Sequence, residues 1–179
     1  AIERAAAMSV FRLPGNDGAI SCTFSRAAPN ASHGLHDKAG LEAVTAALFE
    51  TGKATGLDLE LAFIEMGGLT SLRKVLGPAA AKDMELRLAG ALRAQSHGGG
   101  AAADLGGDRY ALVRHHGESG EALAQRLMRL LAVDPAHGVK AMAKTLSLKG
   151  DASPGQLLRA IRYSLDNFIK DWKEKAEKK

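Results

Sequence analysis

Cysteine and aromatic residues are scarce in this sequence, and each shortage limits what the chain can be. The single cysteine, Cys22, cannot form an intramolecular disulfide, and it has no neighbours spaced for a zinc site. A lone thiol is typical of a reducing compartment, so we expect a cytoplasmic protein. Aromatic residues make up 4% of the 179 residues, so the core must consist mainly of Leu, Ala and Val.

Long apolar runs and a basic surface pattern are also missing. No run approaches the ~18 apolar residues that a membrane-spanning helix needs, and no signal peptide is visible, so we expect no membrane contact by this segment. The net charge is +4, and half of that excess lies in residues 170–179, where five lysines accompany three acids. Because no basic stripe with interleaved aromatic residues occurs elsewhere, nucleic acid is not an expected partner.

The length is that of one ordinary domain with short appendages. We interpret residues 1–35 as a linker or the tail of an upstream segment, residues 36–172 as the domain, and residues 173–179 as a charged tail. Because the chain begins with Ala1 rather than Met, we expect it to be part of a longer protein.

Hydrophobic periodicity and turn residues predict the regular elements of the domain. Asp37 is the expected N-cap of a first helix, which Gly52 and Gly56 should stop. A later helix should bury Leu123, Leu127, Leu130 and Leu131 on one face, and Ser153 followed by Pro154 should begin the last helix. The other expected elements are a buried strand at Leu59–Met66, helices at Leu69–Leu76 and Ala79–Gln95, a loop at Ser96–Ala103, a hairpin whose second strand is Arg109–Arg114, and a half-exposed edge strand at Val139–Leu148.

The order of these elements predicts the fold class. A helix, a strand and two helices come first, then a two-stranded hairpin, a helix, a strand and a last helix. The central hairpin departs from a simple βαβ series. The order predicts a ferredoxin-like, palm-type α/β fold, with a mixed but mainly antiparallel sheet flanked by helices.

One hexapeptide, Leu105–Tyr110 or LGGDRY, carries more information than the rest of the chain. Two glycines and an aspartate between strand-like segments predict a tight hairpin turn, because glycine adopts positive φ without strain. An acid at the tip of such a turn can hold a metal ion near a phosphate chain. The hexapeptide resembles the signature turn of GGDEF domains, the diguanylate cyclase family, in which Tyr110 is an acceptable variant of the aromatic fifth letter.

Other segments extend the resemblance from about Asp37 to Phe168. His36–Leu41 is similar to the opening of the family's domain, Leu61–Glu65 resembles its first core strand, and Gly77 matches a family glycine. The resemblance implies a palm-type nucleotide cyclase fold. It also implies conversion of two GTP molecules into cyclic di-GMP, with Mg²⁺ held by Glu65 and by Asp108 of Gly106-Gly107-Asp108.

The chain departs from the family at the positions that carry this chemistry. The second acid of the first-strand motif is Gly67, and the fourth signature letter is Arg109, whose charge has the wrong sign for a metal ligand. The family's two guanine contacts fall at Arg73 and Lys82; Lys82 can donate hydrogen bonds but cannot accept them. The family's phosphate-contacting lysine falls at Phe168, and the segment His97–Gly100 lacks the family's inhibitory product motif.

The sequence also allows expectations about the ion-pair partner of Arg109 and about metal binding by His115 and His116. Arg109 could pair with Glu65 or with Asp108 and replace the cation electrostatically. His115 and His116 should point to opposite faces of their strand, so we expect no metal ion shared between them.

The leading hypothesis is therefore a catalytically inactive GGDEF-like domain in cyclic di-GMP-type bacterial signalling. It would regulate a protein partner or a linked signalling domain, as a possible homodimer. It would need no cofactor, and Mg²⁺ only if activity is retained. The alternatives are a divergent diguanylate cyclase that uses Glu65 and Asp108 for the metal, and a non-catalytic nucleotide sensor.

Overall fold

The computed structural model describes residues 33–148 and 153–177, with the side chains of residues 53–54 and 171–177 left aside. Residues 1–32, most of the expected N-terminal linker, lie outside the described residues. In chain order the elements are α1 (Lys38–Thr55), β1 (Leu59–Gly67), α2 (Leu69–Leu76), α3 (Pro78–Gln95), the 3₁₀ turn η1 (His97–Gly99), β2 (Ala102–Gly106), β3 (Arg109–His115), α4 (Gly120–Leu131), the 3₁₀ turn η2 (Pro135–His137), β4 (Lys140–Leu148) and α5 (Pro154–Glu177).

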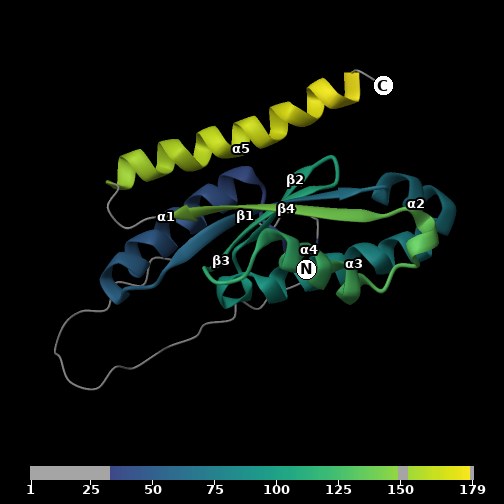
Figure 1. Cartoon of the computed structure of the whole chain (residues 1–179), viewed down its shortest axis with the longest axis horizontal. Helices are drawn as coiled ribbons and strands as arrows, with labels where there is room; N and C mark the ends of the chain where they lie inside the picture. Colours follow the sequence, from purple (N-terminus) through teal and green to yellow (C-terminus); the bar gives the residue numbers. More distant parts are fainter. Residues whose placement is uncertain (1–32, 149–152, 178–179) are drawn as a thin grey trace, which may run out of the picture.

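A four-stranded sheet in the order β2-β3-β1-β4 forms the centre of the fold. All three strand pairs are antiparallel, and an isolated parallel bridge joins His36 to Ala103 beside β2. Helices cover both faces of this sheet, with α1 and α5 on one side and α3 and α4 on the other (Figure 1). The predicted palm-type α/β fold, with a mainly antiparallel sheet between helices, is therefore confirmed.

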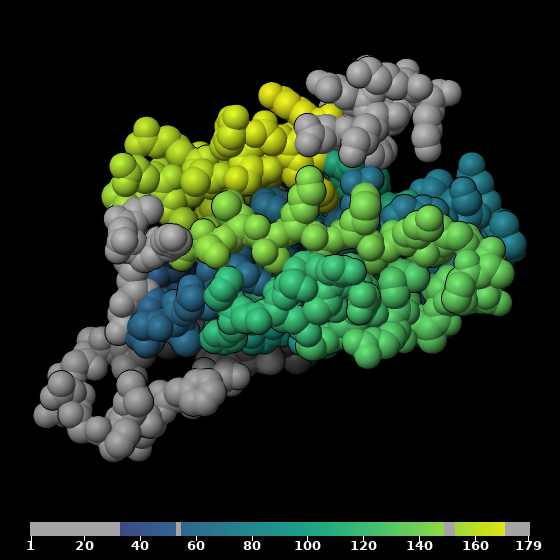
Figure 2. Space-filling view, in the orientation of Figure 1, coloured from purple at the N-terminus to yellow at the C-terminus, as the bar shows by residue number. Residues whose placement is uncertain are grey.

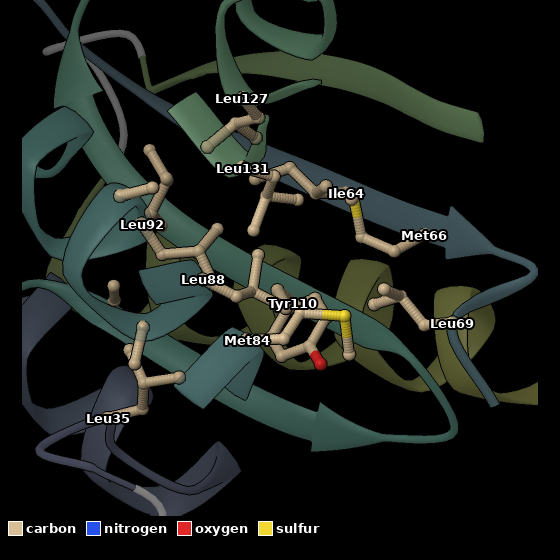
Figure 3. Packing of buried hydrophobic residues seen from close by; sticks show 14 of the residues in the cluster. Leu35, Ile64, Met66, Leu69, Met84, Leu88, Leu92, Tyr110, Leu127 and Leu131 are labelled. Carbon is tan, nitrogen blue, oxygen red and sulfur yellow. The ribbon is translucent and has the colours of Figure 1, made fainter. Parts of the chain in front are cut away.

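Strand β1 is central because its sequence is apolar on both faces. Ala62, Ile64 and Met66 face α3 and α4, whereas Leu61 and Phe63 face α1 and α5. Figure 3 shows how Ile64 and Met66 pack against leucines of the α3 and α4 layer. The alternation of a strand thus gives two separate cores, one on each side of the sheet.

Strand β4 lies at the edge of the sheet, as its alternating pattern predicts. Alternate residues are exposed, and in Figure 2 the strand forms a green surface band between α5 and α4. The solvent-facing residues include Lys140 and Lys144, whose charges disfavour pairing with a further strand.

Side chains cap the start of three helices, at the predicted positions Asp37 and Ser153 and also at Ser119. The Asp37 carboxylate accepts a hydrogen bond from the Gly40 N–H at 2.7 Å, and the Ser119 hydroxyl accepts one from the Ala122 N–H at 3.2 Å. Ser153 and Gln156 form a reciprocal capping box at the start of α5, with N···O distances of 3.4 and 3.0 Å.

Three local expectations were wrong. Gly52 does not stop α1: it is buried inside the helix, its carbonyl accepts hydrogen bonds from the Gly56 and Leu57 N–H groups, and α1 ends at Gly56 with φ 69°. Leu130 is 48% exposed, because only Leu123, Leu127 and Leu131 of the predicted set face the sheet. The expected loop Ser96–Ala103 contains η1 and the beginning of β2.

The start of α4 packs so closely on β4 that only glycine fits there. A Cβ on Gly120 would overlap the carbonyl oxygen of Ala143 and lie 2.9 Å from its carbonyl carbon. We expect Gly120→Ala to lower the free energy of unfolding by about 1–3 kcal/mol, since the backbone of β4 must move. Urea unfolding followed by circular dichroism measures this change.

Gly90→Ala is the matched control, because a Cβ at Gly90 in α3 would meet nothing within 4 Å. This substitution should raise the free energy of unfolding by about 0.5–1 kcal/mol, the gain in helix propensity from glycine to alanine. Equal effects at Gly120 and Gly90 would contradict the packing of α4 on β4.

Candidate functional site

The signature turn between β2 and β3 is a tight hairpin held against the end of β1. Gly106, Gly107 and Asp108 have φ values of 81°, 63° and 60°, and the two-residue loop Gly107-Asp108 has the positive φ pair that type I′ hairpins require. The Met66 N–H donates a hydrogen bond to the Asp108 carbonyl at 2.9 Å. The turn is thereby fixed beside Glu65 and the start of α2.

The Asp108 carboxylate binds the N-terminus of α2. It accepts hydrogen bonds from the Thr70 N–H at 3.0 Å and from the Thr70 hydroxyl at 2.7 Å. The N-cap of α2 is Gly68, which offers no side chain, so Asp108 supplies the missing cap from 38 residues away. A negative charge here is favourable because the helix dipole is positive at its N-terminus.

Arg73 completes the partners of Asp108. Its guanidinium donates a hydrogen bond to the second carboxylate oxygen of Asp108 and forms an ion pair with Glu85 at 3.0 Å. Burial opposes the positive charge of Arg73, but the hydrogen bond and the negative charge of Asp108 outweigh it and raise the pKa of Arg73. The guanidinium therefore stays charged, and it satisfies the carboxylate that the resemblance assigns to Mg²⁺.

Arg109 begins β3, and its side chain lies on the face of the sheet opposite that of Tyr110, because neighbouring strand residues point to opposite faces. Its side chain is 2% exposed, and its guanidinium pairs with Glu65 at 3.2 Å. Glu65 and Arg109 are directly opposed on β1 and β3, which places both side chains on the α1 and α5 face. Of the two partners considered for Arg109 from the sequence, the structure selects Glu65.

Helix α5 closes over Arg109 through Phe168. The guanidinium donates a hydrogen bond to the Phe168 carbonyl oxygen and lies 4.7 Å from the centre of the Phe168 ring. That ring is also 5.2 Å from the ring of Phe63 on β1. The resemblance places a phosphate-contacting lysine at residue 168, but here Phe168 packs its ring against the Arg109 guanidinium.

Tyr110, the fifth letter of the signature, belongs to the core. It packs beside Met84 in the α3 layer (Figure 3), and burial raises the pKa of its hydroxyl above the ordinary value of 10.0. The negative charge of Asp104 raises the pKa further.

The remaining predicted site residues lie apart from one another or bind different partners. Lys82 is exposed on α3, and Gly67 is exposed at the end of β1. Glu65 and Asp108, which the resemblance assigns to one cation, have separate arginine partners. Among residues 33–148 and 153–177, no group of three or more His, Cys, Asp or Glu side chains is arranged to hold a metal ion.

Sequence reasoning did not identify Thr70 or Glu85 as members of this site. Their partners Asp108 and Arg73 lie on other elements, and no local pattern marks them.

A hollow of about 360 Å³ opens beside Arg109 and is lined in part by the edge strand β4. Its lining residues are Phe63, Glu65, Arg109, Glu121, Ala124, Ala141, Met142, Ala143, Lys144 and Phe168.

The sheet order and the helix layers define a palm-type α/β domain, and solved structures similar to it include GGDEF domains. One is a microbial GGDEF domain studied in its interaction with cyclic di-GMP. It matches with TM-score 0.56 and 14% identity, and the match covers 79% of this chain and 90% of that chain. A sensory box/GGDEF family protein from Caulobacter crescentus matches with TM-score 0.54 and 22% identity, over 79% of this chain and 97% of that one.

The diguanylate cyclase SiaD from Pseudomonas aeruginosa, solved with its activator SiaC, matches with TM-score 0.52 and 12% identity. The match covers 81% of this chain and 59% of SiaD. No protein-family model and no curated protein matches the sequence. The structural likeness shows that the described chain is GGDEF-like in its fold.

The buried arginine should contribute to stability. We expect Arg109→Met to lower the free energy of unfolding by about 1–3 kcal/mol, because Glu65 and the Phe168 carbonyl lose a charged donor. Arg87→Met is the matched control. Arg87 is 48% exposed, pairs with Asp83 on the same helix and donates a long hydrogen bond of 3.3 Å to the Leu131 carbonyl, so its loss should change stability by less than about 1 kcal/mol.

Both variants can be compared by urea unfolding. A loss at Arg109 no larger than the loss at Arg87 would show that the contacts of Arg109 do not hold β1, β3 and α5 together.

Tyr110 should make stability fall at high pH. Its pKa is raised in the folded chain, so the folded state keeps a proton that the unfolded state releases above its pKa of about 10. In a Tyr163→Phe variant, which leaves one tyrosine, tyrosinate absorbance should appear only as the protein unfolds. Ionisation with a midpoint near pH 10, in protein that remains folded by circular dichroism, would contradict the buried position of Tyr110.

Proposed function

We propose that this domain is a catalytically inactive GGDEF-like module that regulates other proteins in bacterial cyclic di-GMP-type signalling. The observation that carries the proposal is the pairing of both candidate metal carboxylates with arginine: Glu65 with Arg109, and Asp108 with Arg73. The GGDEF-like fold supports the signalling assignment.

The arginine pairs oppose metal binding. Phosphoryl transfer between nucleotides needs a divalent cation on the phosphates and a means of activating the attacking hydroxyl. A cation at Glu65 would have to displace Arg109, whose side chain is 2% exposed, or lie beside its positive charge. The two positive charges would repel each other, and the charge-assisted hydrogen bond between Arg109 and Glu65 would be lost, so the arginine is favoured.

The residues present fit Mg²⁺ poorly for a second reason. Arg109 stands where the resemblance expects an acid, and Gly67 offers no ligand at the end of β1. Guanine recognition is also unsupported, since Arg73 is committed to Asp108 and Glu85, and Lys82 has only donors.

A regulatory role requires a partner, and we propose a protein partner or a linked signalling domain. The SiaD complex is an example of a diguanylate cyclase bound to an activator protein. Homodimerisation and a cytoplasmic location belong to the same proposal, as does the absence of a nucleic-acid partner. No helix in residues 33–148 and 153–177 combines the length and apolar character needed to span a membrane.

The decisive assay incubates the purified chain with GTP and either Mg²⁺ or Mn²⁺ and measures cyclic di-GMP and pyrophosphate. We expect no product, because neither carboxylate is available to the metal. An active diguanylate cyclase in the same buffer controls for the assay.

A thermal-shift panel with GTP and cyclic di-GMP distinguishes the alternatives. Product that disappears in Asp108→Ala, but not in the control Asp83→Ala, would establish a divergent cyclase. Stabilisation by a nucleotide without turnover, again lost only in Asp108→Ala, would establish a nucleotide sensor. We expect neither result.

A further inference from the structure

We propose that His97 and His115 form a binding site for a zinc-class transition metal, at the end of β3 opposite the signature turn. His97 Nδ1 and His115 Nε2 lie 3.0 Å apart, although the two residues come from different elements. Their rings are 4.8 Å apart, with an interplanar angle of 64°. This site goes beyond the proposed regulatory function and does not depend on it.

The separation of the two nitrogens is close to the bite of one metal ion. Zn–N bonds of about 2.0–2.1 Å in a tetrahedral site place two ligand nitrogens roughly 3.3 Å apart. To bind the same ion, the two nitrogens need to separate by roughly 0.3 Å and the rings to rotate, so that both lone pairs converge on the ion instead of on each other.

The proton balance of binding is simple. In the metal-free protein one of the two facing nitrogens carries a hydrogen and donates it to the other. Metal binding needs a lone pair on both facing nitrogens, so that hydrogen moves through solvent to the far nitrogen of its own ring. The step moves one hydrogen within its own ring, so it needs no net gain or loss of protons by the pair.

The backbone holds both histidines in place before any ion binds. His115 ends β3 and is the register partner of Leu59 on β1. His97 follows Ser96, whose hydroxyl donates to the Arg93 carbonyl at 2.8 Å and accepts from the Ala101 N–H at 3.2 Å. These two hydrogen bonds of Ser96 hold both ends of the turn that carries His97, so the backbone positions of His97 and His115 are set before an ion binds.

The surroundings provide balanced charge and access for water. The pair lines an open hollow of about 760 Å³, together with Glu118, Arg114 and Arg126. The two arginines are neutralised, Arg114 by buried Glu60 at 2.6 Å and by Glu118 at 3.6 Å, and Arg126 by Glu118. Because the Glu118 carboxylate is paired with these arginines, the two histidines are the protein ligands, and water from the open hollow fills the other positions.

The ligand set defines the class of metal. Imidazole nitrogens favour Zn²⁺, Cu²⁺ and Ni²⁺, whereas Mg²⁺ and Ca²⁺ prefer oxygen ligands. His116 is not a member of the site, because its Nδ1 faces Glu60 at 2.8 Å. The sequence expectation that His115 and His116 do not share an ion agrees with this arrangement; the partner of His115 is His97.

The test uses the whole chain, freed of metal, and titrates it with ZnCl₂ by calorimetry at neutral pH. We expect one zinc ion per chain, and at least tenfold weaker binding in both His97→Ala and His115→Ala. His137→Ala, which removes an exposed histidine of η2, is the matched control and should bind within twofold of the parent. Ni²⁺ should compete with Zn²⁺, and Mg²⁺ should not.

Several outcomes would overturn the proposal. They are undetectable zinc binding, unchanged binding in His97→Ala, and binding that disappears in Cys22→Ser but persists without the histidines. If His115→Ala does not fold, His97→Gln serves in its place, because residue 97 lies in a surface turn. Zinc should also raise the unfolding temperature of the parent and of His137→Ala, but not that of His97→Gln.

Discussion

The pairing of arginine with carboxylate at the signature end of the sheet is the constraint on which the rest depends. Arg109 joins β3 to Glu65 on β1 and to the backbone of α5 at Phe168. On the other side of the same turn, Asp108 joins the hairpin to Thr70 and Arg73 on α2. The β2–β3 hairpin, β1, α2 and α5 are thus held together by guanidinium groups where the resemblance expects a metal ion.

Arginine in place of a metal ion affects the chemistry of the site but not the fold. A divalent cation and a buried guanidinium can both neutralise carboxylates, so the hairpin, β1 and α2 keep their arrangement with either group. A guanidinium cannot carry a phosphate-bound metal or accept a proton, because it remains protonated and has no free acceptor. The fold can therefore be retained while the positions that would serve catalysis become structural, with Phe168 covering Arg109.

The sequence predicted the features that depend on local chemistry. Glycine and aspartate in Gly106–Asp108 determine the hairpin turn, and the apolar run Leu59–Met66 determines the central strand. The contacts of Asp108 with Arg73 and of Arg109 with Phe168 span 35 and 59 residues, so they depend on register and helix rotation. For the same reason no local pattern indicated that His97 would face His115.

The most direct test of the account is nuclear magnetic resonance of the labelled chain with Mn²⁺ and GTP. Paramagnetic Mn²⁺ broadens the signals of nuclei near it and would report any cation held between Glu65 and Asp108. We expect the amide signals of Gly106, Gly107 and Asp108 to keep their intensities, because arginines already satisfy both carboxylates. Selective broadening of these signals together with that of Glu65 would contradict the account.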